Sequence, residues 1–334
     1  MRKLVLFFIC MLPLTDGIFS HAQSVGAQDN VEKQDSTVDV IGWFLKNDTV
    51  DYWIKEGRWK VTGNDTVLTA GVSTKVRIVV TDSTSNGYKM DYTFLKFVPD
   101  TLAKSGAGRF MNKLVDNLGK KIVGTTVHFD TDEYGKIIKI HNLGQIKKQV
   151  KNLYKNIALE LESIKELKKA GVDVKKIMKE MDPDEMVDDY LEELKLLFAF
   201  HGTSLILGEF KDHNDATETT YENDTYNENY LEPDDGEYGT FTKVVSIIPK
   251  ETVKAMVGGL VEEFTGDKLD EEKRNEFNKI MNEALKENAT CEDAISIDYH
   301  PSGWPLKVLK SSETKIGNII KSQQTYIYLD AANR

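Results

Sequence analysis

Cysteine is almost absent from this chain of 334 residues, which contains two. Cys10 lies in an N-terminal segment that we expect to be removed, so the mature chain keeps Cys291 alone. One thiol cannot close an intrachain disulfide, and the fold must therefore be stable through its core without cross-links. A single cysteine is more often a small buried apolar residue than a nucleophile, and we interpret Cys291 in this way.

Proline and long apolar runs are also scarce. Seven prolines and 23 glycines exclude a collagen-like or proline-rich chain. After residue 22, no stretch approaches the roughly 18 consecutive apolar residues that indicate a membrane-spanning helix, so we expect no integral membrane segment in the mature chain. Hydrophobic residues make up 40% of the sequence, which excludes a wholly disordered chain and suffices for a sizeable core.

Basic residues are in the minority, since 43 Lys and Arg face 54 Asp and Glu, a formal net charge of −11. Binding to nucleic acid requires clustered Lys and Arg, so this balance argues against a nucleic-acid partner. The sequence also lacks the motifs of zinc proteases, serine hydrolases, phosphate loops and dinucleotide sites. We therefore predict no cofactor and no metal, and a protein that is not an enzyme.

Two short stretches contain residue types that occur in catalytic or metal-binding sites. Asp298, His300 and Ser302 are the residue types of a hydrolytic triad, but three residues of one tight turn rarely reach each other as nucleophile, base and orienting acid do. Asp130 and Asp132 mimic the first half of a calcium loop, yet their flanks predict strands and not helices. We interpret the second stretch as a hairpin turn, and a hydrolase is the least favoured function.

What the sequence does contain begins with an export signal. Met1-Arg2-Lys3 is basic, residues 4–14 form an almost unbroken apolar run, and Ser20-His21-Ala22 places small residues before Gln23. This order is that of a secretory signal peptide, and the run is too short to span a bilayer. We predict a signal peptide at 1–22, a flexible leader at 23–40, a single domain at 41–330, and a periplasmic or extracellular location.

Five tripeptides of the form Asp-(Ser/Thr)-(apolar or Thr) occur between residues 35 and 102, where composition alone predicts roughly one in the whole chain. They resemble the O-glycosylation acceptor motif of exported proteins in a large group of Gram-negative anaerobic bacteria. Asp and Thr are also common at strand ends and turns, which is the ordinary alternative. The acceptor residues that this resemblance implies are Ser36, Thr49, Thr66, Ser83 and Thr101.

From residue 41 onward, a period of two residues predicts long strands. Residues 72–80 and 88–98 flank Asn86-Gly87, a good hairpin turn, and 126–130 pairs with 136–140 in a second hairpin. A last hairpin joins 294–299 to 306–309, and a final strand follows at 325–329. The alternation in 88–98 indicates a sheet with one buried face and one wet face.

Helical periodicity interrupts the strands. Apolar residues recur every three or four positions from Leu143, which predicts a helical segment at 143–201, and Pro249 and Asp270 introduce two further helices. Residues 209–238 are strongly acidic and poor in aliphatics, so we predict a solvated loop, with binding of calcium or of a basic partner as the alternative. The fold class is α+β: a large curved antiparallel sheet covered on one face by amphipathic helices.

A faint internal repeat suggests that the sheet has two similar halves. A strand, a proline, a helical stretch and a hairpin follow each other after Pro99 and again after Pro249. Chance similarity between hairpins is the alternative.

The signal peptide, the Asp-Thr tripeptides and the hairpin Asp298-Tyr299-His300-x-x-Gly303-Trp304-Pro305 resemble exported proteins of unassigned function in Gram-negative anaerobic bacteria. The sheet-under-helices pattern is loosely similar to periplasmic lipoprotein carriers, half-barrels that hold acyl chains. This resemblance implies a non-enzymatic binding protein for an apolar or amphipathic ligand, lipid or lipoprotein-like. Met186, Met256 and Met281 are adaptable residues that would line such a site. The alternative is a glycosylated structural or surface-interaction protein.

Overall fold

The computed structural model describes residues 36–62, 65–99, 119–162, 187–188, 190–217, 220–265 and 270–330. The predicted signal peptide, Thr101 and Met186 lie outside these residues.

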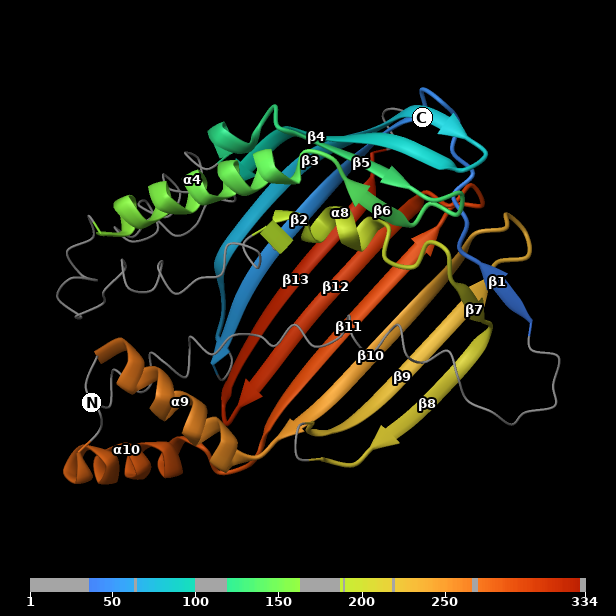
Figure 1. Ribbon diagram of the computed structural model, residues 1–334. Helices are drawn as coiled ribbons and strands as arrows, with labels where there is room; N and C mark the ends of the chain where they lie inside the picture. The colour runs from blue at the N-terminus through green and yellow to red at the C-terminus, as the bar shows by residue number, and fades with distance from the viewer. Residues whose placement is uncertain are drawn as a thin grey trace.

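An antiparallel sheet of 11 strands dominates the molecule (Figure 1). Its strands lie in the order β6-β5-β4-β3-β2-β13-β12-β11-β10-β9-β8, and β6 and β8 are its two edges, so the sheet is not closed. The strands are β2 (Thr49–Thr62), β3 (Asp65–Thr84), β4 (Gly87–Pro99), β5 (Thr126–Thr131), β6 (Ile137–Ile140), β8 (Gly208–Asn214), β9 (Glu222–Leu231), β10 (Tyr238–Ile248), β11 (Ala289–Tyr299), β12 (Pro305–Ile316) and β13 (Ile319–Leu329).

The strand order is one continuous up-and-down path that the chain enters in the middle. Strands β8 to β13 are consecutive neighbours, and so are β2 to β6. The two runs meet where β13 pairs with β2, from Ile319 opposite Thr62 to Leu329 opposite Tyr52. The last strand of the chain therefore joins the two runs, and we call this contact the seam.

The structure describes four α-helices: α4 (Leu143–Glu162), α8 (Glu192–Leu197), α9 (Lys250–Thr265) and α10 (Glu271–Ala284). Figure 1 shows α8 crossing one face of the sheet, whereas α9 and α10 lie at one end of it. These two helices follow β10 and precede β11 along the chain. The prediction of helices after Pro249 and Asp270 is confirmed. Asp270 caps α10, because its side chain accepts a hydrogen bond from the Lys273 backbone N–H at 2.9 Å.

Glycines at the predicted turns explain why the hairpins form where they do. Gly87, after Asn86, has φ 133°, and Gly135 between β5 and β6 has φ 96°, a region that other residues avoid. Asp132 supports the second turn, since its Oδ1 accepts hydrogen bonds from the backbone N–H groups of Tyr134 and Lys136 at 3.0 and 2.8 Å. The calcium-like stretch is thus a hairpin turn, as predicted.

The prediction of a flexible leader up to residue 40 is wrong at its end. Residues Thr37–Asp39 form strand β1, which pairs with β7 (Ser204–Ile206) in a second, two-stranded sheet. Val38 is half-buried and Val40 is completely buried. Burial of these β-branched side chains against the main core offsets the entropy lost in ordering the segment.

The prediction of a solvated acidic loop at 209–238 is also wrong. Most of that segment forms β8 and β9, which pair with each other, and β9 pairs with β10 along its whole length. The strands were missed because they bury few aliphatic residues. Their stability comes instead from ladder hydrogen bonds and from cross-strand aromatic contacts such as Tyr226 with Phe241, whose ring centroids are 5.8 Å apart.

Candidate functional site

Register assigns side chains to the two faces of the main sheet. Tyr52, Ile54, Val308 and Ile297 are all buried, and they lie on the face that carries α8, which we call the inner face. Their sequence neighbours point to the opposite, outer face. Each strand therefore contributes every second residue to the inner face, and the register shows which residues share a row across it.

The first core covers one end of the inner face. It joins buried residues of β2 to β5 and β10 to β13 to two residues of α4 and three of α8. Burial of each large aliphatic or aromatic side chain contributes about 1.5–3 kcal/mol, so this cluster supplies much of the stability of the fold. Its members in the two helices are Ile146, Val150, Leu194, Leu196 and Leu197.

The second core covers the other end of the inner face, where α9 and α10 pack. It contains Met281, which is completely buried, and Cys291, whose side chain is 3% exposed. Met256 packs half-buried against the same cluster. Met281 is thus a packing residue of a filled core, and Cys291 is the buried apolar residue that we predicted.

Between the two cores, the inner face is polar, which the sequence analysis did not anticipate. Three successive rows carry hydroxyl, amide and charged side chains, and we call them the polar belt. Its polar members are Glu56, Thr325, Lys310, Thr242 and Asn227 in the first row, Arg58, Gln323, Ser312, Asp293 and Thr225 in the second, and Lys60, Lys321, Thr314, Ser246 and Asn223 in the third. The same rows also contain the apolar residues Ile295, Val244 and Cys291.

The belt is charged on one side of the sheet and neutral on the other. On the neutral side, Asn227 Nδ2 donates to Thr242 Oγ1 at 2.8 Å, and Asn229 Nδ2 donates to the Ile206 carbonyl at 2.8 Å. Toward the middle, Ser312 Oγ donates to Asp293 Oδ1 at 2.5 Å. These bonds satisfy polar groups of Thr242, Asn229 and Asp293, which are buried on the inner face.

Carboxylates from α8 meet the charged side of the belt. Glu192 Oε1 accepts a hydrogen bond from Lys310 Nζ at 2.6 Å, which fixes the start of α8 over the first row. Burial raises the pKa of Glu193 well above its usual value, and the charge of Glu56 raises it further. Burial likewise raises the pKa of Glu56, together with the charge of Glu192. Both side chains are half-buried.

Two tyrosines of the first core are buried with orphaned hydroxyls. Tyr52 and Tyr92 are each 1% exposed, and neither hydroxyl has a hydrogen-bond partner in the described residues. Burial raises the pKa of Tyr92, and the charges of Glu193, Tyr190 and Glu56 add to this increase.

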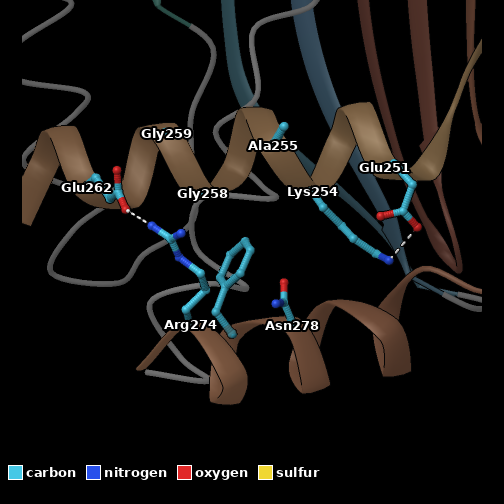
Figure 2. A pocket seen from close by; sticks show the side chains of 9 residues that line it. Glu251, Lys254, Ala255, Gly258, Gly259, Glu262, Arg274 and Asn278 are labelled. Carbon is cyan, nitrogen blue, oxygen red and sulfur yellow. Dashed lines mark hydrogen bonds and ion pairs between the residues drawn. The ribbon is translucent and has the colours of Figure 1, made fainter. Parts of the chain in front are cut away.

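A hollow lies between α9 and α10 (Figure 2). It has a volume of about 360 Å³ and is lined by four charged residues and by Asn278, Ala255, Phe277 and two glycines. Its charged side chains form ion pairs, Lys254 with Glu251 at 2.7 Å and Arg274 with Glu262 at 3.4 Å. Met256 and Met281, which the sequence analysis expected to line an apolar site, are not among the residues that line this hollow.

The stretch with hydrolytic residue types does not form a triad. His300 Nδ1 and Ser302 Oγ lie 2.7 Å apart in an exposed turn. Asp298, however, is turned to the outer face, where its Oδ1 accepts a hydrogen bond from the Tyr230 hydroxyl at 2.9 Å. A base with no orienting acid, in an exposed turn, lacks the arrangement that activates a serine.

Two further histidines, His128 and His201, lie within hydrogen-bond distance of neighbouring residues. His128 is exposed on the outer face, and its Nδ1 lies 2.6 Å from Asp91 Oδ1. His201 is buried, and its Nε2 lies 3.0 Å from the Gly303 carbonyl oxygen. Burial lowers the pKa of His201 to about 4, so it is neutral at physiological pH. Within the ranges that the structure describes, no cluster of metal-ligating side chains is found.

The predicted glycosylation residues differ in exposure. Ser36, Thr49 and Thr66 are exposed, whereas Ser83 is half-buried and donates a hydrogen bond to the Phe44 carbonyl at 3.2 Å. Among the described helices, none combines the length and the apolar character needed to cross a membrane.

The sequence analysis missed the residues on the charged side of the polar belt, although the sequence contains a signal for them. Tyr52, Ile54, Glu56, Arg58 and Lys60 are alternate residues of β2 and change from apolar to charged along the strand. That change marks where the inner face becomes polar. Lys310 and Glu193 could not be added to it, because their neighbours depend on the register and on the position of α8.

No protein-family model and no curated protein matches the chain. A structure of lipovitellin with its lipid–protein interactions aligns with 86% of this chain and 25% of its own, at 12% identity and a TM-score of 0.35. DynF from the dynemicin biosynthesis pathway of Micromonospora chersina aligns over 91% of both chains, at 7% identity and a TM-score of 0.19. The chain spans about a quarter of the lipovitellin chain, and both scores are too low to establish a shared fold.

Proposed function

We propose that this protein is an exported, non-enzymatic binding protein for an amphipathic ligand. The observation that carries the proposal is the division of the inner face, where an apolar core borders a polar belt. An amphiphile matches this division, because its tail loses contact with water against apolar side chains while its head group finds hydrogen bonds. We also propose that the helical segment 143–201 covers this face of the sheet.

Binding of a neutral amphiphile tests the proposal directly. We expect the purified protein to bind dodecyl maltoside saturably below its critical micelle concentration, measured by isothermal titration calorimetry. A large side chain in the belt should block the site, so Ser312→Trp should weaken binding by about tenfold or more.

A matched control is available one residue away. Ser311 lies on the same strand but on the outer face, so Ser311→Trp should leave the affinity unchanged. Circular dichroism should show that both variants keep their strand content. Absence of saturable binding, or equal losses in the two variants, would rule out an inner-face site for amphiphiles.

Exposure of Ser36, Thr49 and Thr66 favours a second candidate, a surface-interaction protein that is glycosylated near its N-terminus. The tripeptides carry this candidate, and their side chains are accessible to a transferase. Intact-mass measurement of the protein from its own host should show added hexose-type mass on the cleaved chain. A mass equal to that of the bare polypeptide would remove this candidate.

A further inference from the structure

We propose that Trp43 and Leu45 insert into the surface of a lipid bilayer and hold the protein against a membrane. We call these two residues the exposed pair. The inference goes beyond the proposed function, because it assigns a second surface of the molecule and does not depend on ligand binding at the inner face.

Trp43 and Leu45 have the most exposed large apolar side chains of the described residues, at 67% and 70%. Phe44, between them, is 2% exposed and belongs to the first core, so its neighbours project into water. The exposed pair lies between β1 and β2, at the end of the sheet away from α9 and α10 (Figure 1). Adjacent apolar side chains of this size that face water mark a contact surface more often than chance exposure.

Hydrogen bonds fix the backbone that carries the exposed pair. The Trp43 N–H donates to the Ser302 carbonyl at 2.9 Å, in the turn between β11 and β12. The Phe44 carbonyl accepts a hydrogen bond from Ser83 Oγ, near the end of β3, at 3.2 Å. The segment is thus joined to two hairpins that lie far apart in the sequence.

The Phe44 ring anchors the same segment in the first core. Its centroid lies 4.1 Å from that of Trp304 and 5.1 Å from that of Tyr88. Gly42 leaves room for this ring, since a Cβ there would lie 2.2 Å from Phe44 Cε2. The exposed pair is therefore held in place before any contact forms, and binding does not have to order this segment.

The size of the exposed pair favours a bilayer over a protein partner. The two side chains expose roughly 200–300 Å² between them, whereas a stable protein interface buries about 800 Å² of each partner. Tyr134, which is 47% exposed and whose carbonyl accepts a hydrogen bond from the Gly42 N–H at 2.8 Å, adds one more side chain at this end. The total is still too small for a docked protein. A bilayer surface needs no complementary shape and takes up single apolar side chains.

The residue types also match a bilayer surface. Tryptophan is enriched where acyl chains meet head groups, because the indole combines an apolar ring with one N–H donor. Lys46 follows the exposed pair, and its stem can lie along the apolar region while its ammonium group reaches a phosphate. Its pair with Asp82, at 3.4 Å between two exposed side chains, is too weak to prevent this.

Flotation with vesicles of palmitoyl-oleoyl phosphatidylcholine tests the inference. We expect the purified protein to float with the vesicles, and the partition coefficient to fall about tenfold in Trp43→Ser and about fivefold in Leu45→Ser. Leu68, on β3 opposite Trp59, is 37% exposed and lies toward the other end of the sheet. Leu68→Ser is therefore the matched control and should leave the partition coefficient unchanged. Circular dichroism should show that all three variants keep their strand content.

Trp43→Phe separates insertion from an indirect effect on the fold. Phenylalanine keeps an apolar ring, so the partition coefficient should stay within about threefold of the wild type. Vesicles with brominated acyl chains should quench the fluorescence of the wild type and not that of Trp43→Phe. The remaining tryptophans should not be quenched, because Trp304 is buried and Trp53 and Trp59 are half-buried on the outer face of β2.

The possible outcomes distinguish this inference from its alternatives. Failure to float, or equal losses in Leu45→Ser and Leu68→Ser, would overturn the bilayer contact. A dimer that Trp43→Ser abolishes, seen by sedimentation velocity without vesicle binding, would also overturn it and would assign the exposed pair to a second copy of the chain. Trp43→Ser should leave the affinity for dodecyl maltoside unchanged, and Ser312→Trp should leave vesicle binding unchanged, so either proposal can fail without the other.

Discussion

At the scale of single residues, Glu193 places an acidic group where its charge is unfavourable. Burial raises its pKa well above the usual 4.5, the charges of Glu56 and Glu192 raise it further, and Lys310 partly counteracts them. The native protein therefore holds a proton that the unfolded chain has already lost above about pH 4.5. The contribution of Glu193 to stability is thus favourable at low pH and decreases as the pH rises.

Glu193→Gln should remove this pH dependence. We expect the variant to be about 1–2 kcal/mol more stable than the wild type near pH 8, because no buried charge has to form, and equally stable near pH 4. Urea unfolding at the two pH values measures the difference. Glu313→Gln, on the outer face, should show no such trend, and a stability gain independent of pH would contradict the explanation.

At the scale of elements, α9 contains two consecutive glycines that weaken it. Glycine in a helix interior costs about 1 kcal/mol relative to alanine, because it loses more conformational freedom on folding. A Cβ added at Gly259 would meet no atom within 4 Å. The residue lies at the hollow between α9 and α10 (Figure 2), so a methyl group fits there without displacing a neighbour.

Gly259→Ala should therefore stabilise the protein by about 0.5–1 kcal/mol. The same substitution should have the opposite sign at Gly87, where φ is 133° and the added Cβ would lie 2.1 Å from the Thr131 carbonyl oxygen. Thermal unfolding of the two variants measures both effects. A loss of stability in Gly259→Ala would indicate that the helix bends at this position in a way that alanine prevents.

Elements with apolar periodicity could be predicted from the sequence, and polar ones could not. The hairpin around Asn86-Gly87, the helix after Pro249 and the cap at Asp270 each carry a local signal, and all three are confirmed. Strand β9 has no such signal. Four of its inner-face residues are polar: Asn223, Thr225, Asn227 and Asn229. Because polar residues also occupy most of the outer face, the strand lacks the alternation of apolar and polar residues by which strands are recognised.

At the scale of the whole molecule, the seam between β13 and β2 makes one sheet from two runs of strands. No local sequence signal pairs strands at opposite ends of the chain, and the position of the polar belt depends on this pairing, because Glu56 meets Thr325 and Lys310 only through it. The sequence therefore predicts that apolar cores form, but it does not predict the polar belt. Its residues become neighbours only when the chain ends come together.

A buried ion network on the outer face holds the seam. Asp51, whose side chain is fully buried, accepts hydrogen bonds from Arg77 at 2.7 and 3.0 Å, and Lys75 bridges Asp51 at 3.1 Å to Asp330 at 2.8 Å. Burial alone would raise the pKa of Asp51, but the hydrogen bonds from Arg77 and Lys75 outweigh it and lower the pKa. The network thus links β2 and β3 to the residue that follows β13.

Asp51→Asn should lower the free energy of unfolding by about 2 kcal/mol at neutral pH, less than for a fully buried pair because Arg77 and Lys75 are partly exposed. Since the native pKa of Asp51 is lowered, its stabilisation is present above the ordinary value of 3.8 and is lost as the pH falls through the native pKa. The difference in stability between wild type and variant should therefore shrink in acid.

Asp82→Asn is the control, because it breaks an exposed pair with Lys46 at 3.4 Å and should cost less than about 0.5 kcal/mol at either pH. Urea unfolding at neutral and acidic pH distinguishes the two sites, and equal effects of both substitutions would show that the network does not stabilise the seam.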